Sequence, residues 1–535
     1  MKKIKKIAGQ ARQRSVMQQQ AEESGPPLTK NLQDNLAALK SIFRGCGEIV
    51  YREFDIGLQG VRGAVVYLEG AVYKPGLHDY VLQSLMLETR QAEPDKKLTG
   101  EELFKTIKDK ALTIANIEEA ENLNRIVEAV LEGEVALLLE GDNRCLNLSM
   151  ASENYRSIQE PLAEAVVRGP RDGFTENISS NIIMVRRRLK TPEFYTEKLK
   201  IGERTKTTVV VGYIKGIADD NIVAEVRQRL NRIRVDGIME SGEIEELIED
   251  NPFSPFPTIN HTERPDKVAA MLLEGRVAIF VDNTPFVLVV PHLFVELLQA
   301  SEDYYDRWII SSLVRIIRYL ALNIAVFLPS LYIAVTTFHQ EMLPTPLLLN
   351  IAGAREGVPF PGFVEALAME IAFEILREAG VRLPRPVGQA VSIVGALVIG
   401  EASVTAGLVS PAMVIVVALT GIASFAISGY GAATTMRILR FPLMILAASL
   451  GLFGIMMGGI VIVIHAVSLR SFGVPYLSPV APFTLKGWRD VIIRGPLWIM
   501  YSRPRVVGYR NPVRQARQLR PQPPEPVADN RGGRQ

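Results

Sequence analysis

Residues 386–431 read PVGQAVSIVGALVIGEASVTAGLVSPAMVIVVALTGIASFAISGYG, and this stretch decides the fold of the chain. It is apolar except for one carboxylate, Glu401, and a scatter of small polar residues. A helix needs about twenty apolar residues to cross a bilayer. Residues 387–409 and 412–430 each meet that length, with Ser410-Pro411 as the break. Glycine, alanine and serine recur every three or four positions, which allows close helix packing. We therefore predict an integral membrane protein.

The average composition of the chain does not reveal this apolar segment. Of 535 residues, 48% are hydrophobic and 22% are charged. These averages combine a charged first 300 residues with an apolar block over 308–469. The net charge of +2 argues against nucleic acid as a partner, since such binding usually needs a concentrated basic face. Cys46 and Cys145 are too few for a disulfide framework or a CxxC metal site. The basic N-terminus lacks the apolar core of a signal peptide, so we expect a cytoplasmic soluble region.

The soluble region contains an internal repeat. Residues 131–141 (LEGEVALLLEG) align with 273–283 (LEGRVAIFVDN), and 65–70 (VVYLEG) align with 211–216 (VGYIKG) at nearly the same offset. Helical and strand patterns alternate in both copies, which predicts mixed sheets with helices packed on them. The predicted fold is thus a duplicated, mixed α/β N-terminal region followed by an all-α, multi-pass transmembrane domain. We place a basic disordered tail at 1–38, subdomain 1 at 39–150 and subdomain 2 at 151–305.

Signals for catalysis are missing from the sequence. It has no GxxxxGK[ST], no GxGxxG after a strand, no HExxH and no GxSxG. The five histidines are dispersed and suggest no ligand cluster. We expect no catalytic residue, no metal site and no cofactor, and hence no enzyme.

The apolar block, 306–470, begins with an amphipathic segment. Trp308, Arg315 and Arg318 suit the membrane interface ahead of a span over 320–338. A loop is expected over 339–358. The next segment, 359–380, carries four glutamates and is too charged to face lipid, so we expect it to be re-entrant, interfacial or buried in an assembly. It either forms an amphipathic surface helix or lines a vestibule, and the vestibule candidates are Glu365, Glu370 and Glu374.

A further span is predicted over 441–469, where Gly451 and its neighbouring glycines allow tight packing. Four full spans place Arg437 and Arg440 outside, against the positive-inside rule, so five or six spans stay open. Residues 471–505 read as an interfacial segment anchored by Trp488, and 506–535 as a disordered, basic, proline-rich tail.

Glu401 is the sharpest functional candidate. An ionisable group in mid-span is costly and often marks a functional site, and a ring of carboxylates in a symmetric oligomer favours cations. Apolar residues one or two turns away would form a constriction that gates the pore; they are Val394, Leu397 and Val398. The alternative is that Glu401 stabilises packing within one protomer.

Three long motifs carry a family resemblance. They are NPFSPFPTINHTERPDKVAAMLLEGRVAIFVDNTPFVLVVP (251–291) followed by EDYYDRW (302–308), RGPRDGFTENISSNIIMVRRRLK (168–190), and GEASVTAGLVSPAMVIVVALTGIASFA (400–426). Together they closely resemble the GerA family of spore germination proteins, specifically the A subunit, over roughly residues 35–505.

This resemblance implies a subunit of a germinant receptor in the inner spore membrane, with its soluble region on the spore core side. Its partners would be a transporter-like B subunit, a lipoprotein C subunit and further copies of itself. The A subunit would oligomerise into a nutrient-gated cation channel. Alternatives are a non-conducting scaffold, an accessory homologue of the germination apparatus and, with less support, a secondary transporter, whose membrane helices would repeat.

Overall fold

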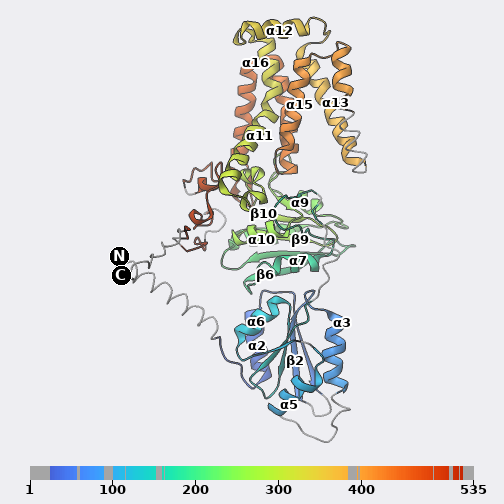
Figure 1. Cartoon of the computed structure of the whole chain (residues 1–535), viewed down its shortest axis with the longest axis vertical. Helices are drawn as coiled ribbons and strands as arrows, with labels where there is room; N and C mark the ends of the chain where they lie inside the picture. The colour runs from blue at the N-terminus through green and yellow to red at the C-terminus, as the bar shows by residue number, and fades with distance from the viewer. Residues whose placement is uncertain are drawn as a thin grey trace, which may run out of the picture. The chain divides into compact units, whose positions relative to one another are not determined.

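The structure, a computed structural model, describes residues 25–56, 61–88, 101–114, 116–151, 160–161, 163–383, 395, 398–485, 487–504, 510–516 and 519–521. The chain forms two compact units (Figure 1). The α/β unit comprises 1–166, 170–249 and 259–291, and the helical unit comprises 167–169, 250–258 and 292–535. Residues 1–24 of the predicted tail lie outside the described residues, as do Val394 and Leu397.

Residues 25–38, assigned above to the tail, belong instead to the α/β unit. Pro27 forms a β-bridge with Asn122, and Leu28 and Leu32 are buried. Helix α2 (Leu32–Ile42) begins here because the side chain of Asn31 accepts from two backbone N–H groups of its first turn.

The first sheet of the α/β unit has five antiparallel strands in the order β1-β2-β4-β5-β3. The strands are β1 (Ile49–Ile56), β2 (Val61–Leu68), β4 (Val135–Leu139), β5 (Cys145–Leu148) and β3 (Ile117–Ala120). All five residues of β4 are buried. The unbroken apolar run VALLL therefore reflects a central strand that is covered on both faces.

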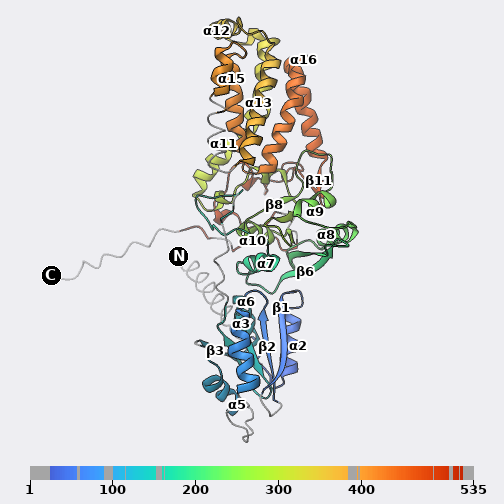
Figure 2. The ribbon, with the colours of Figure 1, turned by 90° about the vertical axis from the view of Figure 1, so that its right-hand side faces the viewer.

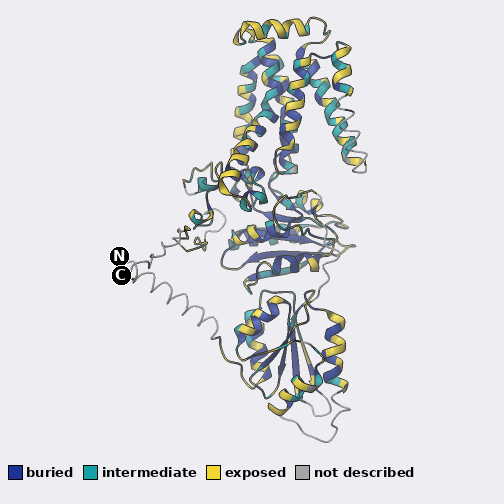
Figure 3. Ribbon diagram, viewed as in Figure 1, coloured by how far each residue is buried: buried dark blue, intermediate teal, exposed yellow. Residues whose placement is uncertain are grey.

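Different helices cover the two faces of this sheet. On one face, Val65 and Leu137 pack with η1 (Leu77–Glu88), α5 (Glu101–Thr106) and η2 (Ile107–Ala111). On the other, Ala64 and Leu138 pack with α2 and α6 (Leu123–Glu132). Helix α3 (Lys74–Gly76) leads into η1. Figure 3 shows the buried strands between the more exposed outer faces of these helices.

The second sheet has the same topology, β6-β7-β9-β10-β8. Its strands are β6 (Phe194–Ile201), β7 (Thr207–Ile214), β9 (Val277–Val281), β10 (Val287–Val290) and β8 (Asn260–Thr262). The aligned sequences VVYLEG and VGYIKG cover the ends of β2 and β7 and the turns that follow them. The aligned sequences LEGEVALLLEG and LEGRVAIFVDN contain β4 and β9. Matching sequence segments thus occupy matching places in the two sheets.

The helices of the second half pack in the same manner. Helices α7 (Ile178–Arg186) and α10 (Pro265–Leu273) form one core with Phe194, Val210 and Phe280. The unit also contains α8 (Asp220–Arg232) and α9 (Ser241–Ile248).

The two halves of the α/β unit meet at the free edge of β6. The Thr196 N–H donates to the carbonyl of Gly45 over 2.8 Å, and the Gly47 N–H donates to Thr196 Oγ1 over 2.9 Å. The guanidinium of Arg186, fully buried, donates from Nε to Glu48 over 2.8 Å. Because backbone pairing and a buried ion pair combine here, the halves form one continuous unit.

Among the described residues, the α-helices of the helical unit are α11 (Trp308–Thr337), α12 (Thr345–Arg355), α13 (Gly362–Arg382), α15 (Pro411–Phe425) and α16 (Tyr430–Ser468) (Figure 2). Helix α12 was not predicted. The predicted loop over 339–358 is wrong, because it contains η5 (Gln340–Met342) and α12, which begins with Pro346 in its first turn. Short segments flank the bundle in the sequence. Two of them precede α11, namely η3 (Phe294–Leu298) and η4 (Ser301–Tyr304). Four follow α16: β11 (Arg470–Ser471), β12 (Val474–Pro475), η6 (Gly487–Asp490) and η7 (Leu497–Ile499).

Helix α16 is a hairpin of two legs, 430–450 and 452–468. Gly451 has a backbone φ of 62° and ψ of −141°, which is not helical and which glycine adopts most readily. A β-carbon on Gly458 would lie 2.5 Å from Leu443, which a straight helix would hold about 22 Å away. The glycines predicted to aid packing therefore lie where one leg passes against the other.

The hairpin brings both ends of α16 to the same end of the bundle. Met436 and Ala466 share a core with Ala321 near the start of α11, whereas Met444 packs with Ile333 near its end. The start of α11 and the two ends of α16 therefore lie together. Arg437 and Arg440, which follow Met436 in the sequence, lie toward that end.

By length and composition, α11 and the segment Gly431–Ser468 are the two helices of the described part of the chain that are able to cross a membrane. Helix α15 is shorter, and most of the predicted span over 387–409 lies outside the described residues.

Candidate functional site

The three vestibule candidates on α13 all meet arginines within the bundle. Glu370 accepts from Arg440 over 2.6 Å, and both side chains are buried. Glu374 accepts from Arg437 over 2.9 Å and lies 3.7 Å from Arg440. The vestibule candidates Glu370 and Glu374 are thus held in an ion-pair network between α13 and the first leg of α16.

Glu365, the third vestibule candidate, lies near the opposite end of the bundle. Its carboxylate accepts from the backbone N–H of Ser410 over 2.9 Å and lies 3.4 Å from the guanidinium of Arg355. Glu365 therefore fixes the start of α15 and meets α12, a helix absent from the prediction. Burial of a carboxylate is tolerated here because both hydrogen-bond and charge partners are present.

Glu401 differs from these three residues. It lies in a helical segment, 398–405, and is exposed, as is Val398, whose side chain is 54% exposed. Among the residues that the structure describes, none forms an ion pair or hydrogen bond with Glu401. The predicted constriction residues Val394 and Leu397 lie outside those residues. Within the described part of the chain, Glu401 thus differs from the three paired glutamates in being exposed and without a partner.

Arg315 and Arg318, predicted at the membrane interface, are buried within the helical unit. Asp303 in η4 receives hydrogen bonds from Arg315 over 3.1 Å and from Arg318 over 2.8 Å. Arg315 also donates to Asp490 in η6 over 2.7 Å. The arginines therefore tie the start of α11 to the segments before and after the bundle. Sequence reasoning missed Asp303 and Asp490, although the acidic EDYYDRW motif contains the first.

The predicted interfacial tryptophans lie near this cluster in sequence. Trp308 is the first residue of α11 and is 36% exposed. Trp488 in η6 is half-buried, and its ring lies 5.6 Å from that of Phe483.

The proline-phenylalanine segment 250–258 packs against both legs of α16. Thr435 on the first leg donates to the carbonyl of Pro255, and His465 on the second leg lies 2.9 Å from Ser254 Oγ. Phe256 is buried beside the rings of Phe294 and Tyr476. In the sequence this segment lies between two parts of the α/β unit, 170–249 and 259–291. In the structure it contacts both legs of α16 near their outer ends.

The described part of the chain contains no group of three or more histidine, cysteine, aspartate or glutamate side chains placed to hold a metal. In the helical unit Glu365, Glu370, Glu374 and Asp303 pair with arginines, whereas Glu401 is exposed.

Comparison with known proteins identifies the protein family. Residues 37–506 match the family described as Bacillus/Clostridium GerA spore germination protein. The chain is 46% identical to spore germination protein KA of Bacillus subtilis, covering 94% of this chain and 92% of that protein. It is 47% identical to the uncharacterized membrane protein YfkQ of the same organism, covering 89% and 91%. The chain therefore belongs to the GerA family of spore germination proteins, and the predicted resemblance is confirmed.

Another relative is spore germination protein GerLA of Bacillus cereus, which is 38% identical over 89% of this chain and 96% of that protein. Among solved structures, the chain is similar to the N-terminal domain of the A subunit of the Bacillus megaterium spore germinant receptor GerK3. That match has 40% identity and a TM-score of 0.41 over 51% of this chain and 98% of the other.

Proposed function

We propose that this chain is the A subunit of a germinant receptor in the inner membrane of spores, and that copies of it form a cation channel lined by Glu401. Family membership supports the role in germination. A transporter-like B subunit and a lipoprotein C subunit would complete the receptor. The channel rests on the contrast between Glu401 and the other carboxylates of the bundle.

The environment of Glu401 carries this proposal. An unpaired charge at the centre of a bilayer costs about 3 kcal/mol. The protomer avoids that cost for Glu365, Glu370 and Glu374 by pairing each with an arginine. Glu401 lacks such a partner among the described residues, which supports a position facing a water-filled lumen between copies of the subunit. A carboxylate there would attract cations.

The distribution of charge supports a core-side α/β unit. The end of the bundle where α11 starts and α16 ends is flanked by Arg307, Arg470, Arg489, Arg494 and Arg503. The connection between α11 and α13 at the other end contains Arg355, Glu341 and Glu356. By the positive-inside rule, this distribution supports a cytoplasmic location for the first end and for the α/β unit that precedes α11 in the sequence.

A multi-pass arrangement follows from the hairpin. The two legs of α16 measure about 31 and 26 Å, lengths close to the hydrocarbon thickness of a bilayer. With α11, α13, α15 and the segment that carries Glu401, the bundle would cross six times. Neither the α/β unit nor the bundle requires a catalytic role in this account.

Thiol labelling tests whether Glu401 faces water. The native Cys46 and Cys145 are buried, so a single introduced cysteine provides the signal. The Glu401→Cys variant in membranes should react quickly with a charged methanethiosulfonate reagent and should form disulfide-linked dimers on oxidation. The matched control is Ile415→Cys, because Ile415 on α15 is apolar and 67% exposed. Equal, slow labelling of both variants would contradict the channel.

A non-conducting scaffold is the second candidate. The dense pairing of α13 with α16 favours it, because that network fills the interior of one protomer with ion pairs. Labelling of Glu401→Cys without any effect of Glu401→Gln on cation release would favour the scaffold.

A further inference from the structure

Arg494 is a buried arginine of the helical unit that has no acidic partner. It lies in segment 489–495, and its side chain is 3% exposed. Among the described residues, its Nε has no hydrogen-bond partner and no carboxylate lies within ion-pair distance of its guanidinium. Burial of a guanidinium is costly unless its charge is balanced. The surroundings of Arg494 are therefore short of one negative charge.

The two carboxylates nearest to Arg494 are already paired. Asp303 receives hydrogen bonds from two arginines of α11. Asp490 accepts from Arg315 over 2.7 Å and from the hydroxyl of Tyr304 over 2.6 Å. The centre of the Tyr304 ring lies 5.7 Å from the guanidinium carbon of Arg494 and 5.9 Å from that of Arg315. Burial lowers the pKa of Arg494 more than Asp490 raises it, so a closer anion would stabilise its charge.

Hydrogen bonds hold segment 489–495 against the start of α11. Ser312 Oγ donates to the backbone carbonyl of Arg494 over 3.2 Å. The Gly495 N–H donates to the carbonyl of Arg489 over 3.0 Å, which closes the segment on itself. Arg494 therefore lies beside the second turn of α11, a helix long and apolar enough to cross a membrane.

The surface beside Arg494 is apolar. Ile309 and Ile316 on α11, about one turn before and after Ser312, are both exposed (Figure 3). Ile493, directly before Arg494, is also exposed. Exposed isoleucines at the end of a membrane helix are suited to contact lipid acyl chains.

Two further arginines make this end of the bundle positive. Arg307 directly precedes α11 and is exposed. The guanidinium of Arg489 lies 5.0 Å over the ring of Tyr501. Neither arginine has an acidic partner among the described residues. A phosphodiester with a net negative charge complements these groups, whereas the cationic choline of phosphatidylcholine is repelled by them.

We propose that Arg494, with Arg307 and Arg489, binds the phosphate of an anionic phospholipid whose acyl chains lie along the exposed isoleucines of α11. The forked guanidinium of Arg494 matches two phosphate oxygens. Basic pockets at the cytoplasmic ends of membrane helices are suited to such headgroups. The site rests on the membrane placement proposed above for the bundle, and it is independent of a channel at Glu401.

Tryptophan fluorescence tests this lipid site, because the three tryptophans of the chain flank segment 489–495 or begin α11: Trp308, Trp488 and Trp498. The full-length protein is placed in phosphatidylcholine vesicles that contain a minor fraction of phosphatidylglycerol. One lipid or the other carries brominated acyl chains, which quench only tryptophans that they contact. Brominated phosphatidylglycerol should quench at a mole fraction lower than that of brominated phosphatidylcholine, by about fivefold for each arginine engaged.

Arg494→Gln should reduce this preference for phosphatidylglycerol at least about fivefold. The matched control is Arg470→Gln, which removes an exposed arginine directly after α16 and should keep the preference. Arg307→Gln changes an exposed side chain and should lower the preference as well, so it tests the site even if Arg494→Gln does not fold. An unchanged melting temperature in pure phosphatidylcholine shows that each variant is folded.

Equal quenching by the two lipids in the wild type would overturn the lipid site, as would an unchanged preference in a folded Arg494→Gln. An equal loss in Arg470→Gln would overturn it too, because net charge alone would then set the preference. Displacement of brominated phosphatidylglycerol by inorganic phosphate would show a site for a free anion instead of a lipid. No quenching by either lipid would overturn the site together with the membrane placement of the bundle.

Discussion

Arg440 donates to Glu370 over 2.6 Å, and the two side chains are 1% and 0% exposed between α16 and α13. The residues are 70 positions apart in the sequence, and the pair fixes the register of the two helices. Glu374, one turn further along α13, meets the same arginine and Arg437. Charge in the interior of the bundle is therefore matched between facing helices.

Removal of one partner of this pair is expected to be costly. Glu370→Leu leaves the guanidinium of Arg440 buried beside Glu374 alone, and we expect a loss of about 3 kcal/mol. The double variant Glu370→Leu, Arg440→Leu should regain much of that loss, since apolar side chains replace both charges. Thermal unfolding in detergent and the protein level in membranes measure both effects.

The control for this prediction is Glu378→Gln. Glu378 pairs with Arg382 on the surface, where both side chains are more than half exposed, so the loss should stay below about 1 kcal/mol. If the double variant were no more stable than Glu370→Leu, the pair would not be the source of the stability.

The hairpin of α16 is sensitive to added volume. A β-carbon at Gly454 would lie 2.1 Å from the backbone oxygen of Leu446, which is unable to move without shifting the first leg. We expect Gly454→Ala to cost about 1–3 kcal/mol, seen as a lower melting temperature. Gly353 on α12 has open space around it, so Gly353→Ala should be neutral or stabilise by up to about 1 kcal/mol. Equal melting temperatures for the two variants would contradict the close approach of the legs.

Low pH should lower the stability of the α/β unit, because it protonates the carboxylate of Glu164. Burial acts to raise the pKa of this carboxyl, but Lys267 and Thr262 outweigh it and lower the pKa below its ordinary value of 4.5. The contribution of Glu164 to stability is therefore present above pH 4.5 and is lost as the pH falls through the lowered value.

The melting temperatures of the wild type and Glu164→Gln, measured between pH 7 and pH 3, test this effect. The difference between them should be largest at neutral pH and should shrink below pH 4.5. Glu128→Gln, at an exposed position of α6, should show no such dependence. A difference that is constant over the whole range would contradict the assignment to Glu164.

The mixed α/β region was predictable because strands and turns leave a signature in the order of neighbouring residues. The apolar runs in β2, β4, β7 and β9 end at glycine turns, and the same runs recur in both halves. Burial on both faces produces those runs directly. The helical character of the apolar block was predicted for the same reason.

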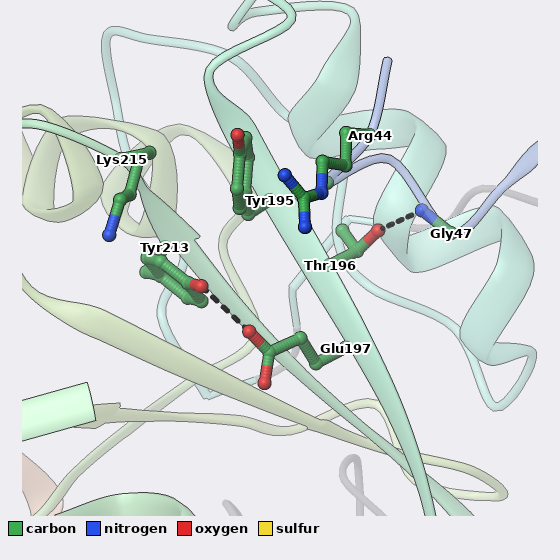
Figure 4. Close-up of a pocket in the computed structure, with 8 residues that line it drawn as sticks. Arg44, Gly47, Tyr195, Thr196, Glu197, Tyr213 and Lys215 are labelled. Carbon is green, nitrogen blue, oxygen red and sulfur yellow. Dashed lines mark hydrogen bonds between the residues drawn. The ribbon is translucent and has the colours of Figure 1, made fainter. Parts of the chain in front are cut away.

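Other features depended on contacts that no local pattern encodes. The turn of α16 at Gly451 lies inside an uninterrupted apolar stretch, which reads as a single helix. The partners of Glu370 and Arg315 follow from the packing of distant helices, so these residues were predicted as vestibule or interface groups. The junction between the two halves of the α/β unit depends on the hydrogen bond between Gly45 and Thr196, about 150 positions away. Figure 4 shows this junction, with Gly47 bonded to Thr196. Glu401 was singled out from the sequence because a lone carboxylate in an apolar segment is itself the signal, and its role stays a prediction.

Cation release from spores that carry Glu401→Gln tests the central claim most directly. The variant keeps the size of the side chain and removes the charge, and Glu378→Gln is the matched control because its carboxylate is exposed but paired with Arg382. With equal receptor levels by immunoblot, release of monovalent cations after germinant exposure should fall severalfold in Glu401→Gln and stay normal in Glu378→Gln. Normal release from the Glu401→Gln spores would contradict a cation path along Glu401.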